Sequence, residues 1–143
     1  MAFNSRLALA ALLILLPAVS RPSEGLPFMA AYLCDPIPMT DAVIDRCMSV
    51  KPELRASYTS LRSDWHRRND APGAELKKRC DAFATAQSST DQVRFKQSVQ
   101  ELNAEAIAQK IAEIDAHPET CQSLLGDISS GKADLQTFVD SNR

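Results

Sequence analysis

The hydrophobic pattern is clearest in residues 51–69, which include the only tryptophan of the chain. Apolar side chains recur there every three or four positions, at Leu54, Tyr58, Leu61 and Trp65. This spacing follows the 3.6-residue period of an α-helix and places the four side chains on one stripe. The sequence therefore predicts an amphipathic helix that inserts two aromatic side chains into a core.

The ends and the polar side of this central helix are also marked. Pro52 suits the first helical turn, where its missing N–H costs nothing. Asn69 tolerates the left-handed conformation of a helix cap, and the cations before it complement the negative end of the helix dipole. Residues 69–73 (NDAPG) are therefore expected to end the helix and turn the chain. The side opposite the apolar stripe carries Arg55, Arg62 and Arg68.

The same period recurs through the rest of the chain and predicts further helices at residues 40–50, 74–87, 91–116, 118–130 and 132–140. In the helix after the predicted turn, Leu76, Cys80 and Phe83 share a stripe and are expected to face the core. Ser89 has the spacing to Gln92 of a capping box. No segment alternates at period two, and so the prediction is an all-α fold. It is a small disulfide-stapled bundle of about five to six helices, with one domain at residues 40–143.

Residues 1–20 have the organisation of a secretory signal peptide. Residues 7–16 are an apolar run that is too short to span a bilayer, which disfavours an N-terminal membrane anchor. Small residues before Arg21 predict cleavage at that point, and cleavage after Gly25 is the alternative. We therefore expect a periplasmic or secreted protein with no stable membrane insertion after cleavage.

A proline-rich stretch at residues 21–39 is expected to form an extended strap that lies on the helical domain. Within it lies the first of four cysteines, Cys34, Cys47, Cys80 and Cys121. An even number of cysteines in an exported chain favours two disulfides, and their scattered spacing disfavours a zinc site. Three pairings are open, and we expect Cys47–Cys121 together with Cys34–Cys80. Finding Cys34–Cys47 would overturn that expectation.

Charge is distributed unevenly, although the net charge is only −2. Basic residues outnumber acidic ones between residues 46 and 79, whereas acidic residues dominate beyond Asp81. One interpretation is that the two halves pack together and neutralise one another. The other is a basic face offered to an acidic partner. The first is favoured because helical bundles commonly place charges in this way.

The two histidines, His66 and His117, are the only candidate bases for a hydrolytic triad. His66 lies next to Arg67 and Arg68, whose charges are expected to disfavour its protonated form. His117 precedes a proline at a helix junction, where a structural role is expected. The motifs of serine hydrolases, zinc proteases and nucleotide-binding loops do not occur. No catalytic residue is predicted, and the protein is not expected to be an enzyme.

Acidic pairs such as Glu101 with Glu105, or Asp64 with Asp70, have the chemistry that glycoside hydrolysis uses. Solvated carboxylates on a helix surface are the expected explanation instead. Two histidines and disulfide-bonded cysteines leave no metal site, so neither a metal nor a cofactor is predicted. Trp65 is expected in the core and the net charge is negative, which disfavours nucleic-acid binding.

Two sets of residues carry a resemblance to known proteins. The first is Cys47…Pro52…Tyr58…Trp65-x-x-Arg68-Asn69, and the second is Cys121…Leu124-Leu125…Gly131…Asp134-Leu135. In these positions, and over most of the mature chain, it resembles small exported helical proteins of unassigned function in Gram-negative bacteria. Its architecture is also similar to that of periplasmic immunity proteins that neutralise cell-wall amidases. Neither resemblance implies a catalytic residue.

These observations predict a non-enzymatic, protein-binding module, such as an inhibitor or immunity-type protein, whose partner is another protein. The candidate partner-binding residues are Arg55, Arg62 and Arg68. The alternative is a carrier of a small apolar ligand, in which aromatic side chains line a cavity between helices. The candidates for that lining are Phe28, Tyr32, Phe83, Phe95 and Phe138.

Overall fold

The computed structural model describes residues 34–141, and all of the regular structure in this range is helical. The elements in chain order are α2 (Ile37–Val50), the short 3₁₀ helix η1 (Pro52–Leu54), α3 (Arg55–Thr85), α4 (Ser89–Ala116), α5 (Thr120–Ser129) and α6 (Gln136–Ser141). The predicted all-α, disulfide-stapled fold is confirmed, with five α-helices in this range. The expected signal peptide and most of the expected strap lie outside the described residues.

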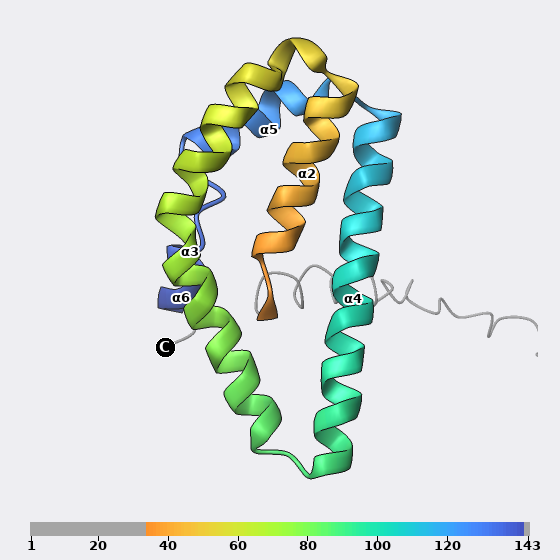
Figure 1. Ribbon diagram of the computed structural model, residues 1–143, viewed down its shortest axis with the longest axis vertical. Coiled ribbons are helices and arrows are strands. Elements are labelled where there is room, and N and C mark those ends of the chain that lie inside the picture. The colour runs from red at the N-terminus through yellow and green to blue at the C-terminus, as the bar shows by residue number, and fades with distance from the viewer. Residues whose placement is uncertain (1–33, 142–143) are drawn as a thin grey trace, which may run out of the picture.

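Helices α3 and α4 form a long antiparallel hairpin, and α2 lies between them (Figure 1). Helix α2 packs against both arms, whereas α5 and α6 pack against α3. Because α2 does not extend to the tip of the hairpin, the molecule has two different ends (Figure 1). We call residues 77–100, around the tip, the open end, and the part where α2, α5 and α6 cover the hairpin the closed end.

The core lies at the closed end, around the first half of α3. Tyr58 and Trp65 are fully buried and Leu61 is nearly so, which confirms the predicted apolar stripe. The two aromatic side chains also place their polar atoms, as buried tyrosine and tryptophan usually do. The Trp65 indole N–H donates to the Ala133 carbonyl at 3.3 Å, and the Tyr58 hydroxyl donates to the Cys121 carbonyl at 2.6 Å. Burial raises the pKa of Tyr58 to about 12.

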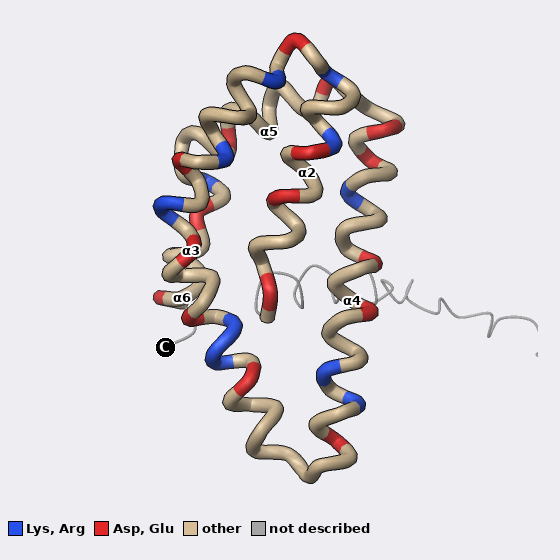
Figure 2. The backbone as a smooth tube through the Cα atoms, in the orientation of Figure 1, with Lys and Arg blue, Asp and Glu red and all other residues tan. Residues whose placement is uncertain are grey.

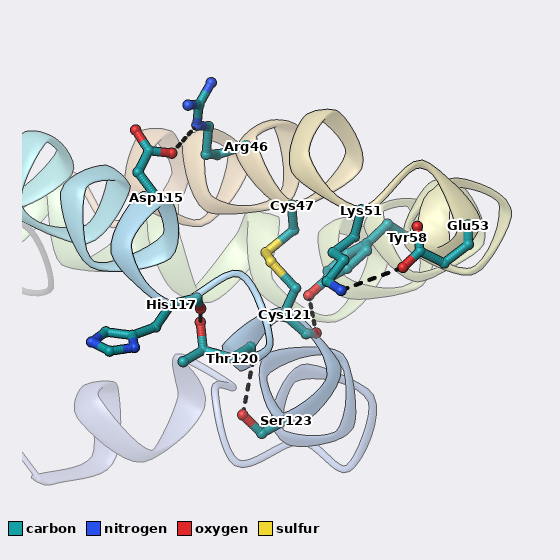
Figure 3. Close-up of a disulfide and its surroundings, with 10 residues drawn as sticks. All are labelled: Arg46, Cys47, Lys51, Glu53, Tyr58, Asp115, His117, Thr120, Cys121 and Ser123. Atoms are coloured by element: carbon teal, nitrogen blue, oxygen red, sulfur yellow. Dashed lines mark hydrogen bonds and ion pairs between the residues drawn. A yellow bond between two sulfur atoms is a disulfide. The ribbon is translucent and has the colours of Figure 1, made fainter.

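Both expected disulfides are present. Cys47–Cys121 joins α2 to α5 across 74 residues of sequence and is fully buried beside Tyr58 (Figure 3). Cys34–Cys80 joins the start of the described chain to the second half of α3 across 46 residues. Closing loops of this length restricts the unfolded chain, which the chain-entropy model values at roughly 4–4.5 kcal/mol per bridge. Two disulfides are consistent with an oxidising, extracytoplasmic compartment. In residues 34–141 no helix combines the length and the apolar character needed to cross a membrane.

Helix α3 runs without interruption through residues 69–73, so the predicted turn there is wrong. Pro72 lies inside the helix, although a proline removes one backbone hydrogen bond. Asn69 does not cap a helix end: it is fully buried, and its amide donates to the Trp65 carbonyl at 2.9 Å. Its side-chain oxygen accepts the Leu135 backbone N–H at 2.6 Å. Contacts with the C-terminal segment thus outweigh the local turn preference of this stretch.

Gly73, which contributed to the prediction of a turn, marks a close approach of three segments instead. A Cβ atom at this position would lie 3.0 Å from Cδ1 of Ile37 and 3.4 Å from Cδ1 of Leu135. The missing side chain therefore lets the start of α2 and the segment before α6 pack directly on the α3 backbone.

Helix α2 begins at Ile37, three residues earlier than predicted, so residues 37–39 of the expected strap are helical. Pro38 lies in the first turn, where a helix does not need the missing N–H. The predicted helix start at residue 40 therefore lies inside α2, whose N-cap is Pro36.

Two other helix starts also differ from the prediction. The N-cap of α4 is Ser88, not Ser89, and its hydroxyl accepts the Asp91 N–H at 3.3 Å. Gly131 breaks the chain after α5 with a φ of +81°, as expected, but α6 begins only at Gln136. The residues between them are held against α3 by side-chain contacts, described below, and do not form a helix.

The predicted core-facing stripe on the second half of α3 holds only at its first member. Leu76 is buried and Cys80 is partly buried, but Phe83 is 57% exposed. The stripe is apolar, yet α2 does not reach this part of the hairpin to cover it (Figure 1). The open end is therefore a two-helix hairpin with little core of its own.

Candidate functional site

Arg68, a candidate for partner binding, fastens the C-terminal segment to α3. Its Nε donates to Oδ2 of Asp134 at 3.0 Å and its Nη2 to the Ile128 carbonyl at 3.0 Å. The buried Asn69 amide donates to the same carboxylate at 3.0 Å. Burial opposes ionisation of Asp134, but the bonds from Arg68 and Asn69 outweigh it and lower its pKa. The bond to Asp134 likewise raises the pKa of Arg68. Arg68 is thus engaged within the molecule.

Arg62, the second candidate, is engaged in the same way with α2. It forms ion pairs with Asp41 and Asp45. Beside it, His66 Nε2 lies 2.9 Å from Oδ1 of Asp41, and His66 Nδ1 lies 2.7 Å from Oδ1 of Asp70. A neutral imidazole has one N–H, so only the protonated ring can donate to both carboxylates.

The pKa of His66 is raised, first by its hydrogen bond to Asp41 and then by the bond to Asp70. The expectation that neighbouring arginines disfavour the protonated form is therefore wrong. Each of those arginines forms an ion pair with a carboxylate that does not contact His66. Arg67 pairs with Asp64, and Arg68 pairs with Asp134. The resulting cluster joins α2 to α3 on the surface of the closed end.

Arg55, the third candidate, is exposed and has no ion-pair partner in the part of the chain that the structure describes. It lies beside a broad, shallow hollow on the outside of α3. The neighbouring side chains in this hollow are small, at Ala56, Thr59, Ser60 and Ser63. The structure thus separates the three arginines, since two are bound within the fold and one is free.

Exposed apolar side chains gather at the open end. Phe83 on α3 is 57% exposed and Val93 on α4 is 67% exposed. The Phe83 ring also contacts Phe95 across the hairpin, with ring centroids 5.2 Å apart. Because large apolar groups on a surface often mark an interaction site, this is the strongest candidate for a binding surface among residues 34–141.

Basic residues also occur on both helices of the open end, as the blue segments of α3 and α4 show (Figure 2). The four that are exposed are Lys77 and Lys78 on α3, and Arg94 and Lys96 on α4. Within residues 34–141, none of the four has an ion-pair partner, in contrast to Arg62 and Arg68. The nearby acids are Asp35, Asp81 and Asp91, so the four exposed cations are still in excess. We call Phe83, Val93, Phe95 and these four cations the open-end surface. It extends around the hairpin, because Phe95 faces α3 whereas Val93, two positions earlier, points to another side of α4.

A cleft of about 240 Å³ lies between α3 and α4 near the Cys34–Cys80 disulfide. We call it the α3–α4 cleft. Its lining includes both cysteines, the apolar Phe95 and Val99, and the polar Lys77, Lys96, Gln100 and Asn103. The side-chain oxygen of Asn103 is buried and has no hydrogen-bond partner within residues 34–141. With Asp35 and Asp81 also in the lining, the cleft combines an apolar wall, two cations, two acids and a disulfide.

The acidic pairs considered for catalysis lie on the surface. Glu101 and Glu105 are exposed on α4, and each accepts a hydrogen bond from a glutamine one turn away. Asp64 pairs with Arg67, and Asp70 contacts His66. These partners hold the carboxylates apart from one another in separate surface contacts.

His117 is exposed at the junction of α4 and α5, close to Thr120 (Figure 3). Its Nδ1 lies 3.2 Å from Oε1 of Glu119. Its carbonyl accepts the Thr120 hydroxyl at 2.7 Å, which fits the structural role expected at this junction. Among residues 34–141, no group of three or more histidine, cysteine, aspartate or glutamate side chains is arranged to hold a metal ion.

Comparison of the chain with protein-family models, with curated proteins and with solved structures found no match.

Proposed function

We propose that the protein is a non-enzymatic protein-binding module of the periplasm, or secreted, that engages its partner through the open-end surface. The observation that carries the proposal is the exposure of Phe83 and Val93, at 57% and 67%, on neighbouring helices. Both side chains are carried by long, regular helices, Phe83 by α3 and Val93 by α4. A pre-ordered apolar surface loses little conformational entropy on binding, which favours affinity.

The chemistry of the surface defines the partner. Phe83, with Phe95 behind it, is suited to enter an apolar pocket, because aromatic side chains commonly dominate binding energy. The unpaired cations around it favour acidic groups on the rim of that pocket, which would accelerate association and set the orientation. The proposed partner is therefore a protein with an apolar depression bordered by aspartate and glutamate.

An inhibitor or immunity-type role is the more specific form of this proposal. It is supported by the resemblance in sequence to small exported helical proteins, by the architectural resemblance to immunity proteins, and by the buried disulfide that stabilises the bundle. In such a role the open-end surface would cover the active site or substrate cleft of an enzyme. The proposal also includes removal of residues 1–20 during export.

The test uses the signal-processed protein with both disulfides formed. Partners are captured from an extract of the oxidising compartment of the host, and the purified pair is then measured by calorimetry. Replacing Phe83 and Val93 together by serine is expected to weaken binding by at least about 10-fold, as for the loss of interface anchors. The fold should be unaffected, because both side chains are already exposed.

Arg55→Ala is the matched control, because Arg55 is exposed and unpaired on a different part of α3. It should leave the affinity unchanged. If Arg55→Ala weakens binding and the Phe83/Val93 double variant does not, the interface lies on the arginine side of α3 and the open-end proposal is wrong.

Carriage of a small apolar ligand is the second candidate, and the α3–α4 cleft is the observation in its favour. At about 240 Å³, however, the cleft is smaller than the roughly 300–1,000 Å³ of sites for drug-sized ligands. Phe95 lines it, whereas Phe138 packs against the core of the closed end. Phe28 and Tyr32 lie outside the described residues. Native mass spectrometry of protein from the host would reveal a bound ligand.

A further inference from the structure

The two disulfides occupy very different surroundings. Cys47 and Cys121 are both fully buried in the closed-end core, with the Tyr58 hydroxyl bonded to the Cys121 carbonyl beside them (Figure 3). Cys34 and Cys80 are each only partly buried, and both line the α3–α4 cleft. One bridge is thus enclosed by packed side chains, whereas the other borders a hollow on the surface.

Access is decisive for the chemistry of a disulfide. Thiol–disulfide exchange begins when a thiolate attacks one of the two sulfur atoms, so the attacking sulfur must reach the bridge. At Cys47–Cys121 this requires the core to open first, because the surrounding side chains leave no space. At Cys34–Cys80 the cleft already provides the space.

Charge alone does not make the cleft reactive. Lys77 and Lys96 favour an approaching thiolate, but Asp35 and Asp81 lie in the same lining and oppose it. The four charges nearly cancel. The difference between the two bridges therefore rests on the access that the cleft gives.

We infer that Cys34–Cys80 is a thiol-exchange site that accepts a small thiol, or a dithiol, through the α3–α4 cleft. A thiolate from the reagent bonds to the sulfur of Cys34 or Cys80, the protein S–S bond breaks, and the other cysteine leaves as a thiolate that takes a proton from water. The second thiol of a dithiol then displaces the first cysteine. The protein disulfide is reduced to two thiols, and the dithiol is oxidised to a disulfide.

Opening this bridge separates residue 34 from α3 and leaves the closed-end core and its own disulfide in place. The cross-link between the start of the described chain and the open end is then lost. The cleft shares Phe95, Lys77 and Lys96 with the open-end surface, but thiol exchange does not depend on protein binding and can be tested without a partner.

The experiment treats the native, oxidised full-length mature protein with dithiothreitol for increasing times. Each sample is quenched with acid, free thiols are alkylated, and the labelled peptides are quantified by mass spectrometry. Cys34 and Cys80 should become labelled on the order of 100-fold faster than Cys47 and Cys121. Equal rates, or faster labelling of Cys47 and Cys121, would overturn the inference.

Two controls separate the effect of the cleft from the intrinsic reactivity of each bridge. In denaturant both bridges should open at similar rates, and a large difference that persists there would contradict the role of the cleft. Val99→Phe, which narrows the cleft, should slow labelling of Cys34 and Cys80 several-fold. The matched variant Val93→Phe, at the exposed tip, should not. If both variants slow the reaction equally, the reagent does not enter through the cleft.

Discussion

The closed and open ends use the same two helices in opposite ways. In the first half of α3, two aromatic side chains, Tyr58 and Trp65, are fully buried, and even the polar Asn69 is enclosed. Beyond Leu76, the one buried residue of α3 is Ala84, whereas Phe83 beside it is exposed. The difference lies in the neighbours: α2, α5 and α6 cover the first half and do not extend to the tip (Figure 1). Burial is therefore decided by which helices reach a side chain and not by its hydrophobicity alone.

The charges differ between the two ends for the same reason. Arg46, Arg62 and Arg68 at the closed end each pair with a carboxylate from another helix or segment, at Asp115, at Asp41 and Asp45, and at Asp134. The exposed cations of the open end, such as Lys78 and Arg94, form no ion pair with any residue of the range 34–141, although acids such as Asp81 lie in the same region. Ion pairs between elements thus neutralise the cations of the closed end, whereas those of the open end remain available.

The largest difference between the two ends should appear when an aromatic side chain is removed from each. Trp65→Ala should lower the free energy of unfolding by about 3–5 kcal/mol, because it leaves a cavity in the core. It also leaves the Ala133 carbonyl without the indole N–H. Phe83→Ala should change it by less than about 1 kcal/mol, because the ring is largely exposed. Urea unfolding of both variants, with disulfides intact, measures the two values.

Similar losses for the two variants would show that the open end has a packed core of its own. In that case Phe83 would not be free to contact a partner, and the division into two ends would have to be abandoned.

Much of the closed end follows from the sequence because its signals are local. The three- and four-residue spacing of Tyr58, Leu61 and Trp65 identifies the buried stripe directly. Cys47 and Cys121 each lie on an apolar stripe of their own helix, which favours a bridge between them, although the sequence leaves three pairings open. Short-range periodicity thus predicts which residues of this end face inward, and the disulfides then join those faces.

The errors occur where a distant segment decides the outcome. Residues 69–73 contain the asparagine, proline and glycine of a turn, but Asn69 bonds to Leu135 and Gly73 packs against Ile37. These partners are remote in sequence. Likewise, Phe83 fits a helical stripe, and the pattern does not reveal that no third helix covers it. The clustering of Lys77 and Lys78 close to Phe83 was the one available sign of a solvent-exposed end.

A smaller effect is expected at the contacts of Asn69 with Leu135 and Asp134, which lie where a turn was predicted. We call these contacts the Asn69 junction. Asn69→Ala should lower the free energy of unfolding by about 1–3 kcal/mol, because the Leu135 N–H is left buried without a partner. The Asp134 carboxylate also loses one of its donors. Asn103→Ala, in the α3–α4 cleft next to the open end, is the matched control. Its side-chain oxygen has no partner within residues 34–141, so the change should stay within about 0.5 kcal/mol.

Chemical denaturation of the two asparagine variants measures this contrast. A cost for Asn103→Ala as large as that for Asn69→Ala would mean that the open end also depends on a buried polar contact. The junction would then not be what distinguishes the closed end.

The smallest effect is a pH dependence confined to the closed end. The pKa of His66 is raised in the folded protein, first by its bond to Asp41 and then by that to Asp70. The folded state therefore holds this proton more tightly than the unfolded chain does. The stabilisation is fully present below the unfolded pKa of about 6.5, and it is lost as the pH rises through the folded pKa. For a partly exposed contact it should amount to no more than about 1 kcal/mol.

Urea unfolding of His66→Gln across this pH range tests the prediction, because glutamine cannot take up the proton. The wild-type protein should lose stability as the pH rises above the unfolded pKa of about 6.5 and through the raised folded pKa, and the variant should lack this decrease. His117→Gln, at the exposed α4–α5 junction, should retain that decrease. If both variants keep the wild-type slope, the His66 contacts with α2 do not stabilise the fold. The closed end would then depend on apolar packing, its disulfide and the Asn69 junction without help from this histidine.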